Sequence, residues 1–166
     1  MRARILLSTA VLTVVCLVSG VNTAAAAFYY GPFRFISTAQ PQRCVTVPAG
    51  STTPGQRLIL WDCTGGRDQY WTLWGGEGPA WHIRNHNSGQ CLAVEEVRNN
   101  GSWLVQRQCS QSLDQFWDVA GLVAAFRNYQ SGQYMSLGSG SGNGSPASAS
   151  RRVGLVRLGG FGWWRR

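Results

Sequence analysis

Residues 91–117 read CLAVEEVRNNGSWLVQRQCSQSLDQFW, and they repeat the pattern of residues 44–71, CVTVPAGSTTPGQRLILWDCTGGRDQYW. In each stretch a cysteine is followed 18 or 19 residues later by a second cysteine, and then by a Gln-x-Trp motif. The matching cysteines and Gln-x-Trp motifs lie 46 or 47 residues apart. Repeated units of this length cannot bury an apolar face alone, so neighbouring copies pack against one another. The pattern therefore predicts a single domain made of packed repeats.

The first 27 residues have the organisation of a secretory signal peptide. A start containing Arg2 and Arg4 precedes an apolar stretch at residues 5–21, and the alanines at 24–27 offer small-residue cleavage sites. The uninterrupted apolar run is too short for a transmembrane anchor, and no basic flank follows it. We therefore expect a secreted, extracellular protein whose mature chain comprises residues 28–166, which is long enough for one domain.

Four of the five cysteines lie in the expected mature chain. Export to an oxidising compartment implies that they form two disulfides, for which three pairings are possible. Equivalent copies should be bridged equivalently, which favours Cys44–Cys63 and Cys91–Cys109. Four cysteines also suit zinc, but their spacing contains no CxxC knuckle. We therefore expect no metal ion and no cofactor.

Short stretches of alternating residues, such as 57–61, are typical of strands, and the clusters of Pro, Gly and Ser between them are typical of turns. No stretch after the signal segment shows a sustained helical period. Residues two apart on a strand face the same way, so Gln69 shares a face with Trp71, and Gln115 with Trp117. We expect an all-β fold with both indoles in its core and both amides directed towards neighbouring loops.

A third copy begins and then fades. Residues 124–133, AAFRNYQSGQ, echo residues 81–90, WHIRNHNSGQ, and residues 134–137 follow where a first cysteine would stand. Residues 138–150 are rich in Gly and Ser, which is typical of a flexible linker rather than of a packed strand. The rest of the chain contains neither a second cysteine nor a Gln-x-Trp motif. The sequence thus predicts repeats at about 33–74, 80–121 and 124–166, with the third one degenerate.

Positive charge is concentrated in the last third of the chain. All 15 basic residues are Arg, the formal net charge is +8, and beyond Asp118 there are six Arg and no acidic residue. The tail at 161–166, FGWWRR, suits an anionic cell-envelope surface, because Trp favours the lipid interface and Arg binds phosphate. Disorder of the tail, or a wrong reading frame after about Gly144, explains the same composition. We expect no specific nucleic-acid partner, which would require a groove that the sequence does not predict.

The stretches "QRCVTV … ILWDC … DQYW" and "NSGQCLAV … QRQC … DQFW" resemble the repeats of the ricin B-type lectins. The same domain is known as a family 13-like carbohydrate-binding module on bacterial glycanases. The resemblance covers about residues 33–137. It implies a β-trefoil, in which three four-stranded units close a barrel that is capped by a triangle of hairpins. Closure leaves no exposed sheet edge, so we expect a monomer.

The resemblance also implies a shallow sugar site in each copy. In the family an Asp two residues after the first cysteine accepts hydroxyl hydrogens, and an aromatic ring two residues before the second cysteine stacks on the sugar. An Asn then precedes the Gln-x-Trp, whose Gln braces the site. The first copy has Thr46, Trp61, Asp68 and Gln69 at these four positions. We expect the carbohydrate-binding site here, with Asp68 supplying the acceptor and Thr46 a hydroxyl.

The other two copies depart further from the family. Ala93 and Ser136 stand at the Asp position, and neither is a carboxylate. Arg107 replaces the stacking ring in the second copy. Asp114 and Gln115 are retained there as weaker candidates, whereas the third copy cannot be completed from its sequence.

No catalytic constellation is visible. His82 and His86 would share a face only on a helix, whereas a strand and a turn are expected here, so they do not form a metal-binding pair. Glu95 and Glu96 point to opposite faces of a strand, which excludes an acid–base pair. No Ser or Thr has a partnered His in a recognisable motif. We therefore do not expect an enzyme.

Taken together, the sequence favours a secreted, non-catalytic, carbohydrate-binding domain. Two alternatives stay open. The missing carboxylates at positions 46, 93 and 136 also suit a decayed lectin that serves as a scaffold for protein interaction or inhibition. The Arg-rich C-terminus also suits binding to an anionic surface.

Overall fold

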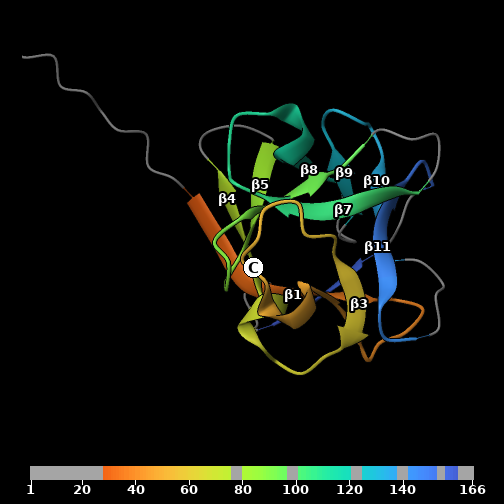
Figure 1. Cartoon of the computed structure of the whole chain (residues 1–166). Helices are drawn as coiled ribbons and strands as arrows, with labels where there is room; N and C mark the ends of the chain where they lie inside the picture. Colours follow the sequence, from red (N-terminus) through yellow and green to blue (C-terminus); the bar gives the residue numbers. More distant parts are fainter. Residues whose placement is uncertain are drawn as a thin grey trace, which may run out of the picture.

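A computed structural model describes residues 28–75, 80–96, 101–120, 125–137, 142–152 and 156–160. This part of the chain forms twelve strands and three short 3-10 turns (Figure 1). The first repeat contains β1 (Phe28–Ser37), β2 (Arg43–Thr46), β3 (Ile59–Asp62) and β4 (Trp71–Gly75). The second contains β5 (Ala80–Asn85), β6 (Cys91–Val94), β7 (Ser102–Arg107) and β8 (Phe116–Ala120). The third contains β9 (Ala125–Asn128), β10 (Tyr134–Leu137), β11 (Ser145–Ser150) and β12 (Val156–Gly159).

The strands pair as a barrel capped by three hairpins. In the barrel β1 pairs with β4, β4 with β5, β5 with β8 and β8 with β9, and β12 returns to pair with β1. The hairpins are β2–β3, β6–β7 and β10–β11, and β11 also pairs with β3 and with β7. Figure 1 shows β11 beside these two strands. Three equivalent four-stranded units of this kind make a β-trefoil, which confirms the predicted all-β fold class.

The core is built from equivalent residues of the three repeats. Trp71 and Trp117 are completely buried, as the Gln-x-Trp spacing predicts. Their indole N–H groups donate to the carbonyls of Val45 and Leu92, at 3.4 and 3.0 Å. Each of these bonds joins the last strand of a repeat to that repeat's second strand, so the motif links the barrel to its cap. The buried indole therefore finds both an apolar environment and an acceptor.

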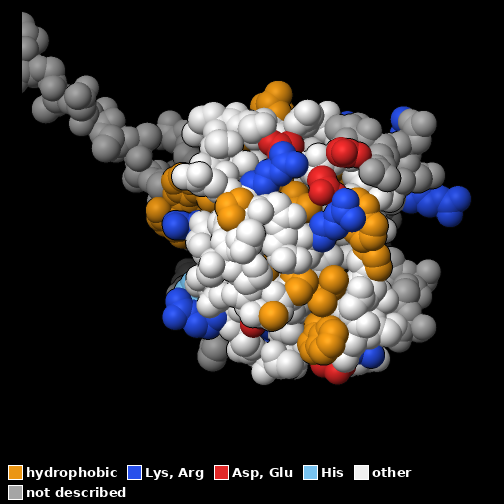
Figure 2. Space-filling view, viewed as in Figure 1, with side chains coloured by type: hydrophobic (Ala, Val, Ile, Leu, Met, Phe, Trp, Pro, Cys, Tyr) orange, Lys and Arg blue, Asp and Glu red, His pale blue; other side chains and the backbone are white. Residues whose placement is uncertain are grey.

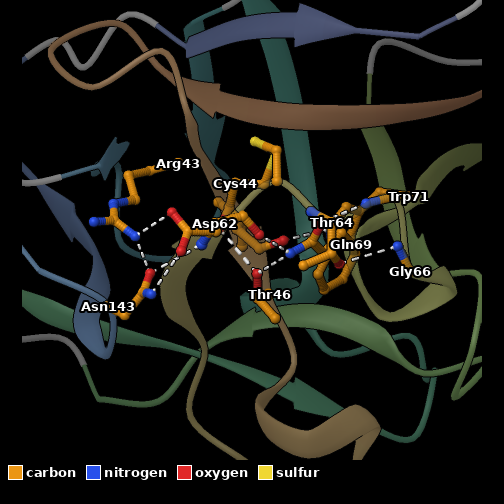
Figure 3. Close-up of a disulfide and its surroundings, with 12 residues drawn as sticks. Arg43, Cys44, Thr46, Asp62, Thr64, Gly66, Gln69, Trp71 and Asn143 are labelled. Carbon is orange, nitrogen blue, oxygen red and sulfur yellow. Dashed lines mark hydrogen bonds and ion pairs between the residues drawn. A yellow bond between two sulfur atoms is a disulfide. The ribbon is translucent and has the colours of Figure 1, made fainter.

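Both expected disulfides are present. Cys44 is bonded to Cys63, and Cys91 to Cys109, with Cα–Cα distances of 5.1 and 5.0 Å. Each bridge joins the second strand of a repeat to the segment that follows the third strand. Figure 3 shows the bridge of Cys44. Closing a loop of this size in the unfolded chain stabilises the folded state by about 3 kcal/mol.

The third repeat is more regular than its composition suggests. The linker expected at residues 138–150 is wrong for residues 145–150, which form β11 at the centre of the cap. Ala147 and Ala149 are completely buried, and Ser148 between them is half-buried. The strand packs there because small side chains fit where three hairpins meet, and its backbone hydrogen bonds do not depend on side-chain type. The signal for this strand was the alternation of Ala and Ser at period two.

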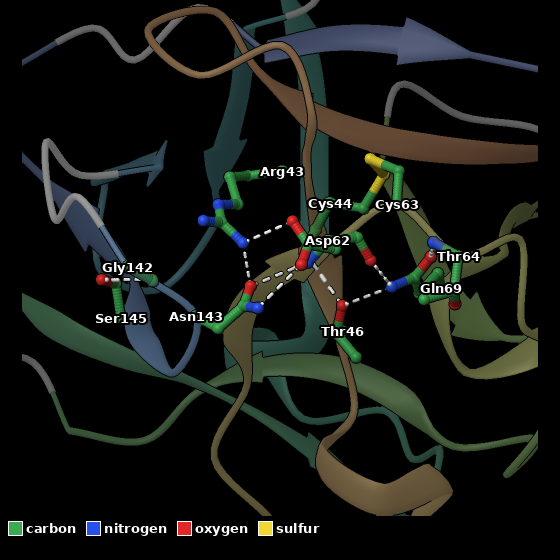
Figure 4. A network of polar contacts seen from close by, with 10 residues as sticks. All are labelled: Arg43, Cys44, Thr46, Asp62, Cys63, Thr64, Gln69, Gly142, Asn143 and Ser145. Atoms are coloured by element: carbon green, nitrogen blue, oxygen red, sulfur yellow. Dashed lines mark hydrogen bonds and ion pairs between the residues drawn. A yellow bond between two sulfur atoms is a disulfide. The ribbon is translucent and has the colours of Figure 1, made fainter.

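A polar cluster joins the third repeat to the first. Arg43 on β2 and Asp62 on β3 form an ion pair at 2.6 Å. Asn143, just before β11, donates to the Asp62 carboxylate at 2.8 Å and accepts from the Asp62 backbone N–H at 2.9 Å (Figure 4). It also accepts from the Arg43 guanidinium. The loop that precedes β11 is therefore attached to the first hairpin by side-chain contacts as well as by strand pairing.

The expected signal peptide at 1–27 and the basic tail at 161–166 lie outside the described residues, so both stay predictions. In the part that is described, no helix has the length and apolar character needed to cross a membrane.

Candidate functional site

Gln69 lies at the centre of a bracing network in the first repeat. Its side chain is buried, and its Oε1 accepts from the backbone N–H groups of Thr64 and Gly65, at 2.9 and 3.2 Å. Its Nε2 donates to the Asp62 carbonyl at 2.7 Å and to the Thr46 hydroxyl at 3.0 Å (Figure 4). A glutamine amide offers two donors and two acceptor lone pairs, so all of its capacity is used. Gln69 therefore shapes the loop after Cys63 and presents no free amide hydrogen to a ligand.

The Thr46 hydroxyl belongs to the same network. Thr46 is only 5% exposed, and its Oγ1 donates to the Cys44 carbonyl at 3.0 Å while it accepts from Gln69. Figure 3 shows it directed at the Gln69 amide, inside the repeat. The structure thus places Thr46 in the framework of the site rather than at its surface.

Trp61 and Asp68 are the two sequence-predicted residues that remain accessible. Trp61 lies on β3 with 41% of its surface exposed, which is unusual for an indole. Asp68 lies in the turn η2 (Arg67–Gln69) and is half-buried. Its backbone carbonyl accepts from Asn85 at 2.9 Å, but no described residue donates to its carboxylate. The first repeat therefore offers an aromatic face and an unused acceptor.

The second repeat holds a charged pair where the first has these two residues. Arg107 donates to the Asp114 carboxylate at 3.1 Å and to the Glu95 carbonyl at 3.3 Å. The Asp114 side chain is only 9% exposed, and its Oδ1 is buried without a hydrogen-bond partner among the described residues. A cavity of about 160 Å³ lies here, lined by Val94, Glu95, Arg107, Ser112, Asp114, Asn128 and Gln130. The guanidinium fills the place of the stacking ring, so the cavity is polar.

The backbone positions of Trp61 and Asp68 match those of Arg107 and Asp114 in the second repeat. Arg107 and Trp61 each lie opposite the first cysteine of their hairpin. Asp114 and Asp68 each precede the Gln of their 3-10 turn, which in the second repeat is η3 (Leu113–Gln115). Trp61 and Asp68 therefore occupy the backbone positions that Arg107 and Asp114 occupy in the second repeat.

The remaining sequence candidates take structural positions. Gln115 repeats the bracing role, since it accepts from Ser110 N–H at 2.9 Å and donates to the Gln108 carbonyl at 3.0 Å. Ala93 is completely buried. Ser136 is half-buried on β10, and its carbonyl accepts from the Ser148 hydroxyl at 3.3 Å.

Two asparagines that the sequence analysis did not single out join adjacent repeats. Asn85 donates to the Asp68 and Tyr70 carbonyls, at 2.9 and 3.3 Å. Asn128 makes the equivalent bonds to the Asp114 and Phe116 carbonyls, at 2.7 and 3.3 Å. Each therefore holds the 3-10 turn of the preceding repeat, in which the candidate carboxylate lies. The echo of Arg-Asn at 84–85 and 127–128 was their signal in the sequence.

The two histidines differ in burial. His82 is buried between the rings of Trp74 and Phe116, at centroid distances of 5.3 and 4.2 Å. Burial lowers the pKa of His82 below its ordinary value of 6.5, although its bond to the Ser110 carbonyl opposes this shift. His86 is exposed in the turn after β5. Within the described residues, no group of three or more His, Cys, Asp or Glu side chains is placed to hold a metal ion.

The trefoil barrel, its bridged hairpins and its Gln-x-Trp braces define a lectin-type domain. The chain belongs to the ricin-type β-trefoil lectin family, whose model matches residues 32–152. A comparison with curated protein sequences finds no significant match.

Solved structures share the fold at low sequence identity. A designed three-fold symmetric protein, ThreeFoil, has a TM-score of 0.71 at 20% identity, with 80% of this chain and 99% of that chain covered. The exo-β-1,3-galactanase of Clostridium thermocellum has a TM-score of 0.69 at 16% identity, covering 78% of this chain and 30% of the galactanase. The Polyporus squamosus lectin has a TM-score of 0.65 at 11% identity, covering 78% of this chain and 48% of the lectin. The chain thus spans less than half of either natural protein.

Proposed function

We propose that this protein is a secreted, non-catalytic lectin that binds carbohydrate through its first repeat, with Trp61 as the stacking ring and Asp68 as the acceptor. The observation that supports this most is the exposed indole of Trp61 at the family's stacking position, in a repeat that also holds an Asp68 carboxylate to which no described residue donates. Two disulfides are typical of proteins from oxidising compartments, which supports secretion.

The Trp61 and Asp68 side chains suit different parts of a sugar. An indole face packs against the apolar C–H face of a pyranose, and a carboxylate accepts hydrogens from two neighbouring hydroxyls. Gln69 and Thr46 hold the intervening loop in place through the network described above. Because such a site relies on one ring and few hydrogen bonds, its affinity for a single sugar is expected to be weak.

The second repeat serves as the internal comparison for this proposal. Arg107 cannot stack in place of Trp61 while it is bonded to Asp114. We therefore propose that the second repeat does not bind the same sugar.

The proposal is tested on a glycan array with the purified protein, a Trp61→Ala variant and an Arg107→Ala variant. Loss of glycan binding in Trp61→Ala, with binding retained in Arg107→Ala, is the expected result. Loss in Arg107→Ala alone would show that the first-repeat assignment is wrong.

The two alternative functions make different predictions in the same assay. Free monosaccharide releases a lectin from its glycan but leaves a protein–protein contact intact. Binding to an anionic surface falls steeply with ionic strength, whereas sugar stacking does not. Figure 2 shows Arg side chains interspersed with Asp and Glu on the viewed face, and Arg57 is paired with Glu95 at 2.8 Å. This face therefore lacks the uniform positive charge that would favour an anionic surface.

A further inference from the structure

A cleft of about 300 Å³ is lined by none of the residues at the family's sugar positions. It is formed by β1, β4, β5 and the turn that follows β5. The side chains that characterise it are those of Tyr29, Thr72, Trp74, Arg84, His86 and Asn87. None of the residues that contribute to the Gln69 network lines it.

The sheet register explains why these side chains gather. Tyr29 lies opposite Trp74 across the β1–β4 pair, and Thr72 lies opposite Arg84 across the β4–β5 pair. Directly opposed residues of an antiparallel pair share a face, and so do residues two apart on one strand. The four side chains therefore project from the same outer face of three adjacent strands.

The cleft offers aromatic surface. Tyr29 is 63% exposed. Trp74 stacks on His82 with a centroid distance of 5.3 Å and an interplanar angle of 22°, so its indole is held in one orientation. An exposed Tyr beside a fixed indole is suited to the C–H face of a sugar ring.

The cleft also carries an unneutralised positive charge. The Arg84 Nε donates to the Gly89 carbonyl at 2.7 Å, which orients the guanidinium and leaves its two terminal nitrogens without an acceptor among the described residues. Among the described residues, no Asp or Glu lines the cleft. Two parallel N–H groups of an Arg match the two oxygens of a carboxylate, and such charge-assisted pairs are about twice as strong as neutral hydrogen bonds.

We propose that this cleft is a second glycan site that is selective for acidic pyranoses, in which Arg84 binds the sugar carboxylate and Tyr29 packs against the ring. The proposal shares with the proposed function the premise that the protein binds glycans. It concerns a different site, so the two can fail separately.

The third repeat contains a natural control for Arg84. Arg127 makes the same local contact, since its Nε donates to the Gly132 carbonyl at 3.2 Å. However, Arg127 lies opposite Asp118, whereas Arg84 lies opposite Thr72. In the sequence, Ala120 stands at the repeat position that corresponds to Trp74. The Arg127 guanidinium thus comes from a position opposite an acidic residue, on a strand whose partner has no indole at this position.

The experiment compares methyl β-glucuronide with methyl β-glucoside, which differ only at C6, where the first has a carboxylate and the second a hydroxymethyl group. Saturation-transfer and chemical-shift titrations are recorded on the full protein, Arg84→Gln, Tyr29→Ala, Arg127→Gln and Trp61→Ala. We expect the protein to bind the glucuronide at least about tenfold more tightly than the glucoside, as one charge-assisted pair implies. Arg84→Gln removes this preference and Tyr29→Ala weakens both sugars, whereas Arg127→Gln leaves the preference unchanged. Trp61→Ala tests only whether the glucuronide is bound in the first repeat.

Three results would overturn the proposal. The first is equal binding, or no binding, of the two sugars by the unaltered protein. The second is an equal loss in Arg84→Gln and Arg127→Gln, which would indicate an effect of overall charge. The third is loss of glucuronide binding in Trp61→Ala, which would move the acidic sugar to the first-repeat site. If the protein shows no preference for the glucuronide but still binds neutral glycans on the array, the proposed function is retained and only the second site is wrong.

Discussion

The amide of Asn143 and the carboxylate of Asp62 lie 2.8 Å apart, although 81 residues separate them in the sequence. Asn143 belongs to the loop before β11, and Asp62 directly precedes Cys63. Because the Asp62 carbonyl also accepts from Gln69, this contact connects the third repeat to the network that shapes the first-repeat site. The candidate site is therefore supported from a repeat that contributes no residue to it.

Replacement of Asn143 tests this support. Asn143→Ala removes a donor and an acceptor from Asp62, and we expect the free energy of unfolding to fall by about 1 kcal/mol. Urea denaturation measures the change. Gln111→Ala, an exposed position with no side-chain partner in the described structure, serves as the control and should leave stability unaltered.

The two bracing glutamines should differ in their effect on stability. The Gln69 side chain makes four hydrogen bonds, whereas that of Gln115 makes two. Replacement of Gln69 by Ala leaves buried partners unsatisfied, and we expect a loss of about 2 kcal/mol or more. Gln115→Ala should lose less under the same denaturation conditions. The reverse order would contradict the idea that hydrogen-bond number sets the strength of each brace.

Stability should decrease in mild acid because of His82. The pKa of His82 in the folded state lies below the 6.5 of an unfolded chain, so the unfolded state binds a proton first as the pH falls. The contribution of His82 is complete above pH 6.5 and is lost as the pH falls towards the folded-state value. Unfolding is measured at about pH 8 and about pH 5.5. His82→Gln should reduce the difference between the two, whereas replacement of the exposed His86 should not.

The packing of β11 can be tested directly. Ala149 is completely buried where the hairpins meet, so Ala149→Leu overfills the cap, and we expect a loss of about 1–3 kcal/mol. The half-buried neighbour Ser148 provides the matched change, Ser148→Leu, which should cost less. Thermal unfolding distinguishes the two, and equal tolerance would mean that β11 does not pack in the cap.

A sugar site should be recoverable in the second repeat. The double variant Arg107→Trp/Asp114→Asn introduces the aromatic ring and the amide of the family and leaves no buried carboxylate unpaired. Two sites on one molecule raise the apparent affinity for a multivalent glycan surface by about tenfold or more. Binding is measured on a glycan-coated sensor, with the single variant Asp114→Asn as control. If the double variant shows no increase in apparent affinity, the lack of a carboxylate at Ala93 is itself sufficient to prevent sugar binding by the second repeat.

The repeat explains why much of the fold was predictable. The spacing of Cys44, Cys63 and Gln69 recurs one repeat later, so pairing, core and brace could be assigned by equivalence. The end of the third repeat was not predicted because the repeat contains neither the cysteines nor the Gln-x-Trp motif. Its β11 is recognised only by the alternation of Ala147 and Ala149, a weak signal in a Gly/Ser-rich stretch.

Side-chain partners at the candidate site were less predictable. Thr46 stands at the right position in the sequence, but the direction of its hydroxyl depends on the buried amide of Gln69. The contact of Arg107 with Asp114 follows from the distance between a strand and a 3-10 turn, which spacing alone does not give. The cleft at Tyr29 and Arg84 requires three strands to be in register, and two of these are separated by the whole first hairpin.

The pairing of β12 with β1 sets the order in which the barrel can be completed. β1 is made before and β12 after all the other described strands, yet residues 34–37 of β1 pair with residues 156–159 of β12. β12 must therefore be synthesised before this seam can form. The disulfides close loops within one repeat, so they can form before the seam does. Until β12 pairs with β1, the domain is therefore an open sheet of bridged repeats rather than a closed barrel.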